Sequence, residues 1–228
     1  MPKVYVFLAY EKEVLRVGFK VRECGAAQSE IKYEKDGEPV HKDGAAEMFL
    51  KPFGEIKYRK DGEPVYKDSA VEMFFKPFDG DARYLNFEFN AEGFGILGFG
   101  EGKTDRKELI HKYKKDLSVR VVSPRKEPVE NGECKASGKE PVENGERKAG
   151  GEIERSAFVW ELYFDIPFKM ISEIYGADFR VYKGRRVRAN FYKCGDETPL
   201  PHYGAAFQVE SPFPEFHLPE FFGTLIFD

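Results

Sequence analysis

Apolar and polar side chains alternate along several short stretches of this chain, most clearly at residues 84–90, YLNFEFN. With a period of two, Leu85, Phe87 and Phe89 fall on one face, and Tyr84, two asparagines and a glutamate fall on the other. This pattern predicts a β-strand with one buried face and one face of hydrogen-bonding groups. Such a polar face suits either solvent or a neutral, hydroxyl-rich ligand.

The same alternation recurs later in the chain. In residues 186–192, RVRANFY, it directs Val187, Ala189 and Phe191 inward and Arg188, Asn190 and Tyr192 outward. In residues 158–166 it places Trp160 on the buried face. Further strands are expected at 4–8, 14–21, 71–75, 117–122 and 224–227, and short helical turns at 104–113 and 168–175. We therefore predict an all-β protein, an antiparallel β-sandwich of jelly-roll or immunoglobulin-like type, with residues 1–228 as a single domain.

Two tandem duplications interrupt the strand pattern. Residues 30–54 and 55–79 are identical at 19 of 25 positions, and each copy is a charged loop followed by one strand. Two copies are too few for a solenoid. The second copy runs directly into 84–90, so its strand should form a hairpin there, while the first copy should bulge out or add an edge strand. The second duplication lies within a polar loop or arm at 124–154.

Composition narrows the classes of partner. The 228 residues include 22 Phe, 12 Tyr and one Trp, and the net charge of −4 comes from well-mixed acidic and basic side chains. Neither nucleic acid nor a membrane is favoured as a partner. No basic leader with a long apolar run begins the chain, so we expect a cytoplasmic protein as written, or an extracellular one if the N-terminus is incomplete. Cys24, Cys134 and Cys194 show no paired spacing and are expected to be free thiols.

The chain contains neither a GxSxG nor an HExxH motif. Glu72 and Glu88 lie on strands expected to pair and could act as the two carboxylates of a glycosidase. His202 and His217 could approach each other as an acid/base or metal-binding pair. The glycine-rich segment 91–103 matches no phosphate-binding fingerprint, and its glycines more commonly mark bulges or close packing.

Sugar binding requires aromatic faces for stacking, and planar amides or charged groups for bonds to adjacent hydroxyls. Tyr192 and Tyr203 are the predicted stacking rings. The predicted polar contacts are Asn86, Asn90, Asn190, Glu88 and Arg188, with His202 nearby.

Five blocks of sequence, taken in order, resemble one family. They are residues 64–78, 84–106, 160–168, 188–203 and 214–227, and they are similar to carbohydrate-binding family 9-like proteins, relatives of the family 9 modules of xylanases and, more distantly, of the DOMON superfamily. The resemblance implies a β-sandwich that binds a carbohydrate in a shallow site without catalysis, with structural calcium.

This chain departs from the two-tryptophan clamp of the xylanase modules because it has a single Trp. Where the family usually places a Ser-Trp pair, this chain reads GAAFQV, and Phe207 could substitute. We predict non-catalytic binding of an oligosaccharide or glycan in carbohydrate catabolism. The alternative is an enzyme that hydrolyses glycosyl bonds with paired carboxylates. A haem module, as in distant DOMON relatives, lacks a convincing Met and His axial pair.

Deletion of residues 30–54 should leave a folded protein, because the second copy of the duplication is the one that continues into the strand at 84–90. Circular dichroism and a cooperative thermal transition would check this expectation. A deletion variant that is unfolded would show that the first copy is required.

Overall fold

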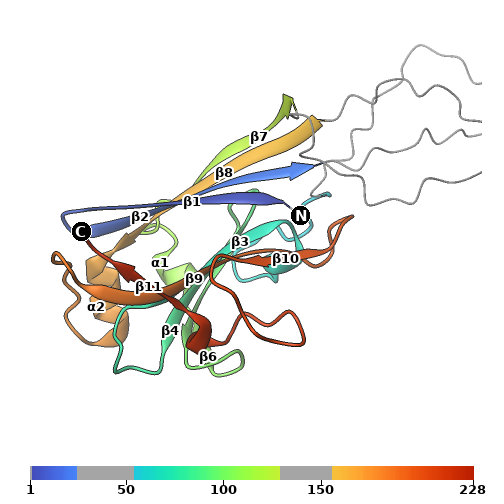
Figure 1. The fold of residues 1–228 in the computed structure, drawn as a ribbon. Helices are drawn as coiled ribbons and strands as arrows, with labels where there is room; N and C mark the ends of the chain where they lie inside the picture. Colours follow the sequence, from blue (N-terminus) through green and yellow to red (C-terminus); the bar gives the residue numbers. More distant parts are fainter. Residues whose placement is uncertain (1, 25–53, 129–155) are drawn as a thin grey trace, which may run out of the picture.

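The computed structural model describes residues 2–24, 54–128 and 156–228, which form two antiparallel β-sheets (Figure 1). The smaller sheet has the strand order β1–β2–β8–β7, with bounds β1 Lys3–Glu11, β2 Val14–Cys24, β7 Arg120–Pro128 and β8 Ser156–Pro167. The predicted all-β sandwich is confirmed.

The larger sheet has the order β10–β9–β3–β4–β5–β6, and β11 also pairs with β9. Its strands are β3 Ala70–Lys76, β4 Tyr84–Asn90, β5 Gly95–Gly100, β6 Arg106–Glu108, β9 Arg186–Gly195, β10 His202–Ala205 and β11 Gly223–Ile226. The described helices are α1 Ile110–Tyr113 and α2 Phe168–Tyr175, and the 3₁₀ turns are η1 Val65–Lys67 and η2 Pro219–Phe221.

The core lies between the two sheets and is built from alternate residues of the facing strands. β2 contributes Leu15, Val17, Phe19 and Val21, and β4 contributes Leu85, Phe87 and Phe89. Trp160 is completely buried in this layer, as its place in the alternation predicts.

The hairpin of β3 and β4 is confirmed, with pairing from Ala70 opposite Asn90 to Phe75 opposite Leu85. The second copy of the first duplication therefore supplies η1 and a central strand of the larger sheet. The first copy, apart from Gly54, lies outside the described residues.

The polar loop predicted at 124–154 starts later than predicted, because residues 124–128 belong to a strand. β7 continues to Pro128 and pairs with β8, and the register shifts between Val122 and Arg125. Pro124 has no N–H to donate, and this irregularity accommodates it within the strand. Residues 129–155 lie outside the described part of the chain.

One of the three cysteines is not the free thiol that the sequence predicts. Cys24 is disulfide-bonded, so the prediction of a free thiol is wrong for it. Spacing along the chain could not reveal this bond, because disulfide formation depends on distance in space. Cys194 is a free and buried thiol, and Cys134 lies outside the described residues.

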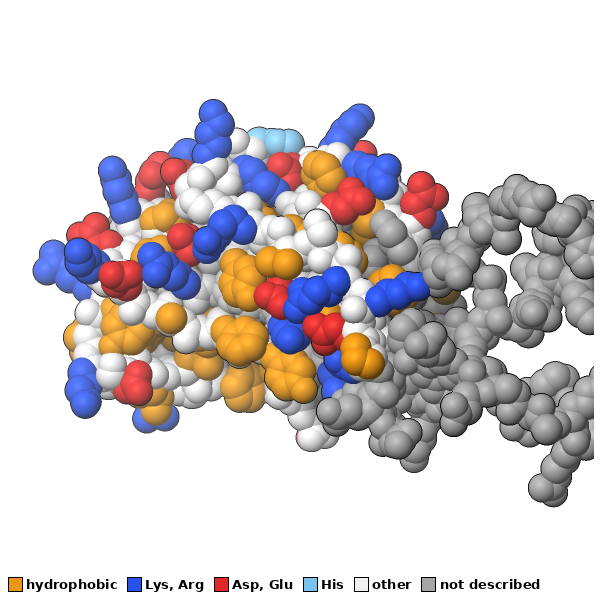
Figure 2. All heavy atoms as spheres, turned by 90° about the horizontal axis from the view of Figure 1, so that it is seen from above, with side chains coloured by type: hydrophobic (Ala, Val, Ile, Leu, Met, Phe, Trp, Pro, Cys, Tyr) orange, Lys and Arg blue, Asp and Glu red, His pale blue; other side chains and the backbone are white. Residues whose placement is uncertain are grey.

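Figure 2 views the molecule from above the smaller sheet, where hydrophobic side chains gather among charged ones. Tyr5 and Phe7 of β1 are each 52% exposed. Gly18 of β2 leaves room for the ring of Tyr163, because a Cβ at this glycine would lie 2.8 Å from that ring. No helix in the described ranges is long and apolar enough to cross a membrane.

A buried ion pair connects the two sheets. Lys193 Nζ of β9 lies 3.1 Å from Glu23 Oε1 of β2, and both side chains are almost fully buried. The ammonium also donates to Ser69 Oγ at 3.0 Å and to the Cys194 carbonyl at 2.8 Å. These bonds offset part of the cost of removing the charges from water.

Replacing Lys193 with Met should lower the free energy of unfolding by about 3–5 kcal/mol, because the Glu23 carboxylate would remain buried without its cation. Urea denaturation at pH 7 measures the change. The control is Lys107→Met on the exposed face of β6, for which we expect a change within about 0.5 kcal/mol. Equal stability of the two variants would contradict the role given to the ion pair.

Candidate carbohydrate-binding site

The outward face of the larger sheet is covered by the chain segment 206–222, which we call the C-terminal cover. All seven residues of β4 are buried, although their alternation predicts one open polar face. Aromatic side chains of the sheet pack against the cover in a second, smaller core of Phe74, Tyr84, Tyr192 and Phe222, with Val209 and Phe216 beside them. The expectation of an open polar face on β4 and β9 is therefore wrong.

A pocket of about 310 Å³ remains where the cover stops short of the sheet. Its lining comes from β3, β4, β9, the β5–β6 region, η1, β10 and the cover. The residues are Tyr66, Glu72, Glu88, Lys103, Arg106, Cys194, Asp196, Tyr203, Pro214, Glu215, Phe216 and His217.

A larger hollow of about 520 Å³ lies beside α2. Two of its charged side chains bind other protein groups: Asp81 is bound by Arg83 at 2.6 Å, and the Arg185 guanidinium donates to the carbonyls of Arg180 and Pro77. Among the described residues, Arg185 Nε is buried without a hydrogen-bond partner, and so is Glu88 Oε2 in the smaller pocket. The smaller pocket is the better candidate because its unpartnered atom is an acceptor, which a ligand hydroxyl can satisfy.

Two carboxyl groups form the floor of the pocket. Glu72 of β3 lies directly opposite Glu88 of β4 in the hairpin, on the outward face, and each residue is 4% exposed. The Cys194 thiol donates to Glu72 Oε1 at 3.0 Å. Glu88 Oε2 is buried and has no hydrogen-bond partner among the described residues. An orphaned buried acceptor of this kind points to a ligand donor.

Burial dominates the electrostatics of this floor. It raises the pKa of Glu88 to about 7, and Arg106 opposes that rise. Burial together with the neighbouring Glu88 raises the pKa of Glu72 well above its ordinary value. Both shifts favour the protonated acids, as expected for carboxyls that have left water and adjoin a like charge.

Arg106 reaches the pocket across a glycine. Its guanidinium lies over Gly98, where a Cβ would come within 3.2 Å of it, and donates to Asn86 Oδ1 at 2.5 Å. The glycine-rich segment therefore contains the strand β5, and its lack of side chains allows close packing, as the sequence indicates.

His217 belongs to the same wall and is held neutral. Its Nδ1 lies 2.8 Å from the Tyr84 hydroxyl, and burial with the nearby Arg106 lowers the pKa of His217 to about 3. Arg106 Nη1 lies 3.4 Å from the same nitrogen and can only donate, so Nδ1 of the neutral ring is an acceptor, and the Tyr84 hydroxyl donates to it.

Aromatic rings line the upper part of the pocket. Phe216 stacks on Tyr192 with a centroid distance of 4.1 Å and an angle of 14°, and the Tyr192 hydroxyl donates to the Phe216 carbonyl at 3.1 Å. Tyr66 and Tyr203 are partly exposed at its rim. The pocket thus combines three aromatic rings with carboxyl, ammonium and guanidinium groups.

Glu88 and Tyr203 are the two predicted sugar contacts that lie in this pocket. Glu72 and His217, considered in the sequence for catalysis, also line it. Asn86 lies beneath Arg106, and Tyr192 supports the ring of Phe216 from behind. Of the three sugar contacts predicted on β4, Asn86, Glu88 and Asn90, Glu88 alone lines the pocket.

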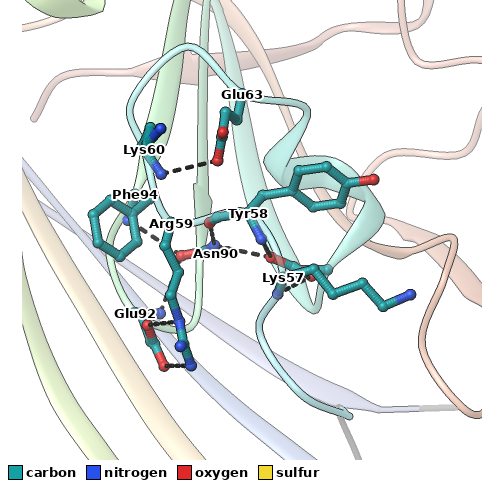
Figure 3. Close-up of polar contacts among 9 residues, drawn as sticks. Lys57, Tyr58, Arg59, Lys60, Glu63, Asn90, Glu92 and Phe94 are labelled. Atoms are coloured by element: carbon teal, nitrogen blue, oxygen red, sulfur yellow. Dashed lines mark hydrogen bonds and ion pairs between the residues drawn. The ribbon is translucent and has the colours of Figure 1, made fainter.

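Asn90 shapes a turn instead of a ligand site (Figure 3). Its Nδ2 donates to the Tyr58 carbonyl at 2.8 Å, and its Oδ1 accepts from the amides of Glu92 and Phe94, each at 3.1 Å. The amide nitrogen and oxygen of this side chain both form hydrogen bonds within the protein. Asn90 is not one of the residues that line the pocket.

Asn190 and Arg188 attach the C-terminal cover to β9. Asn190 Nδ2 donates to the Phe207 carbonyl and Oδ1 accepts from the Phe207 amide, both at 3.0 Å. Arg188 donates to the carbonyls of Phe222 and Glu220. These residues face outward as the alternation predicts, but they bind the protein's own main chain.

His202 joins the buried ion pair. Burial and the adjacent Lys193 lower the pKa of His202, and its Nε2 lies 2.9 Å from the ammonium. Its Nδ1 lies 2.7 Å from the Leu200 carbonyl. His202 and His217 therefore serve different networks, and the proposed histidine pair has no support in these contacts.

Sequence reasoning missed several lining residues, chiefly Lys103, Arg106, Phe216 and Tyr66. All four lie inside blocks that resemble the family, but for the first three the residue type alone gave no reason to select them. Tyr66 replaces His41 of the first copy of the duplication, and this substitution was the available signal.

Structural calcium, implied by the resemblance, stays a prediction, because calcium also accepts main-chain and amide carbonyl oxygens as ligands. Within residues 2–24, 54–128 and 156–228, no group of three or more His, Cys, Asp or Glu is placed to hold a metal ion. Asp81, in the Asp-Gly-Asp turn, is committed to Arg83.

The model of carbohydrate-binding family 9 matches residues 53–136 and 145–227. The chain belongs to carbohydrate-binding family 9. The match begins beside the second copy of the duplication, which is the copy that forms β3. Membership of the family shows that the ligand is a carbohydrate, and binding is the function that it supports.

The solved structures include a similar fold. A candidate carbohydrate-binding protein from Bacteroides uniformis ATCC 8492 aligns over 100% of this chain and 79% of its own, with a TM-score of 0.60 and 24% identity. This likeness supports the sandwich fold. No curated protein matches the chain.

Replacing Asn190 with Ala should lower the free energy of unfolding by about 1–3 kcal/mol, because it leaves the main-chain groups of Phe207 unpaired. Hydrogen exchange at the Phe207 amide should become faster. Thr224→Ala on the exposed side of β11 is the control and should change neither quantity. Unchanged exchange at Phe207 in the Asn190 variant would show that other contacts hold the cover.

Proposed function

We propose that the pocket between the larger sheet and the C-terminal cover binds the carbohydrate, and that it does so without catalysis. The observation that carries this assignment is the buried, unpartnered Glu88 Oε2 at the base of an aromatic-walled pocket. A sugar hydroxyl supplies the missing donor.

The other walls supply what a sugar ring requires. Tyr203, Tyr66 and Phe216 offer faces for its C–H groups, and Lys103 and Arg106 offer N–H donors to hydroxyl oxygens. These three rings stand in place of the two-tryptophan clamp. The volume of about 310 Å³ suits one or two sugar rings, near the lower limit of small-molecule sites.

The placement of the two glutamates argues against glycoside hydrolysis. Hydrolysis needs one carboxyl on each side of the scissile bond, either to protonate the leaving oxygen or to activate the attack. Glu72 and Glu88 come from adjacent strands and share one floor, so a bound sugar lies above both. In carbohydrate catabolism, this protein then recognises a glycan, and another protein degrades it.

Calorimetry against glucose, galactose, xylose, cellobiose, maltose and lactose, followed by a glycan array, tests the assignment. We expect saturable binding with no release of product from any glycan. A folded protein that binds none of these carbohydrates would overturn the proposal, and product formation that is lost in Glu88→Gln would favour the enzyme.

Replacing Tyr203 with Ala should weaken binding of the best ligand about 5- to 150-fold, which corresponds to about 1–3 kcal/mol for one stacked ring. Stability should change little, because Tyr203 is partly exposed. Tyr5→Ala, which removes an exposed tyrosine of the smaller sheet, is the matched control. Equal affinities of the two variants would exclude Tyr203 as a stacking platform.

A further inference from the structure

The two glutamates at the floor of the pocket are unusually poor in cationic partners. They face each other across the β3–β4 hairpin, where opposed Cβ atoms of an antiparallel pair lie about 4.5–5.5 Å apart. Among the described residues neither carboxyl forms an ion pair, and the guanidinium of Arg106 donates to Asn86 instead. The thiol of Cys194 is the hydrogen-bond donor to Glu72.

Two adjacent carboxyls in such surroundings do not both ionise readily. The first negative charge opposes the second, and both groups have lost most of their contact with water. Burial raises the pKa values of both acids, that of Glu88 to about 7. Paired acids of this kind titrate together, and the shared proton belongs to the pair.

The other charged groups around the pocket do not favour ionisation of both glutamates. Lys103 and Arg106 carry positive charge, whereas Asp196 and Glu215 carry negative charge, and Lys103 is paired with Glu215 at 3.1 Å. His217 is neutral, and burial raises the pKa values of Cys194 and Tyr203, so both stay protonated. No excess of positive charge faces the pair.

We propose that an uncharged sugar binds best while Glu72 and Glu88 are both protonated, and that above neutral pH, where the pair keeps a single shared proton, binding takes up the second proton from solvent. This inference rests on the proposed function of the pocket. A carboxyl proton of the pair is donated to a sugar oxygen, while Glu88 Oε2 accepts from a sugar hydroxyl. A neutral ligand displaces water and brings no charge to stabilise a carboxylate, so affinity falls as the pH rises.

The test is calorimetry between pH 5.5 and 8.5 with the sugar of the six named above that binds best. For the wild type, we expect the dissociation constant to rise above pH 7, by up to about tenfold per pH unit. Buffers of different ionisation enthalpy should reveal proton uptake in the same range. Glu88→Gln, which imitates the protonated acid, should bind the sugar with little dependence on pH. Glu101→Gln, at an exposed site outside the pocket, should keep the wild-type profile.

A second measurement does not need the sugar. A buried acid binds its proton more tightly in the folded protein than in the unfolded chain, so stability falls as pH rises through the interval between the two pKa values. Below about pH 6.5 the buried, neutral His202 and His217 contribute the opposite slope, because their pKa values are lowered. The urea midpoint of the wild type should therefore fall between about pH 6.5 and 8, and Glu88→Gln should lack much of that slope.

The outcomes separate the two claims. Sugar binding that is independent of pH, or that strengthens as pH rises, overturns the link between protonation and binding and leaves the pocket as the binding site. Equal pH slopes of the urea midpoint in the wild type and in Glu88→Gln also overturn it. Absence of sugar binding at every pH, with the difference in slope present, overturns the proposed function and supports the protonated pair alone.

Discussion

The hydrogen bonds from Asn190 and Arg188 to the main chain of residues 206–222 are the constraint on which the binding face depends. They attach an irregular segment to the outward face of the larger sheet, and the rings of Phe74, Tyr84 and Tyr192 fill the space beneath it. The pocket exists because this cover is incomplete above Glu72 and Glu88. The same segment supplies Phe216 and His217 as walls, so the sheet provides the floor and the cover provides much of the shape.

Alternation in the sequence predicted the sandwich well, because the rule depends on one buried face per strand. It located β4 and α2 at their observed bounds and placed Trp160 in the core. The strands β5, β6 and β10 were not predicted. Glycines obscure the pattern in β5, β6 is a three-residue strand within the helical turn expected at 104–113, and β10 has only four residues. The predicted hairpin placed Glu72 and Glu88 on paired strands, and the structure sets them directly opposite each other.

The binding residues were harder to predict because alternation tells which face a side chain takes and not what lies above that face. Asn190 and Asn90 have the right chemistry for a sugar, but main-chain groups of the same protein satisfy them first. Glu88 differs from them in retaining an unpartnered oxygen. Free hydrogen-bonding capacity, which is a property of the tertiary structure, separates the candidate contact from the structural residue.

The position of the cover in the chain has a consequence for biosynthesis. Both sheets, except for β11, are encoded before residue 206, and the pocket walls Phe216 and His217 come after it. During synthesis from the N-terminus, the strands of the sandwich core emerge before residues 206–222 do. Until that segment emerges, the rings of Phe74, Tyr84 and Tyr192 on the outward face lack their cover, and the pocket lacks two of its walls.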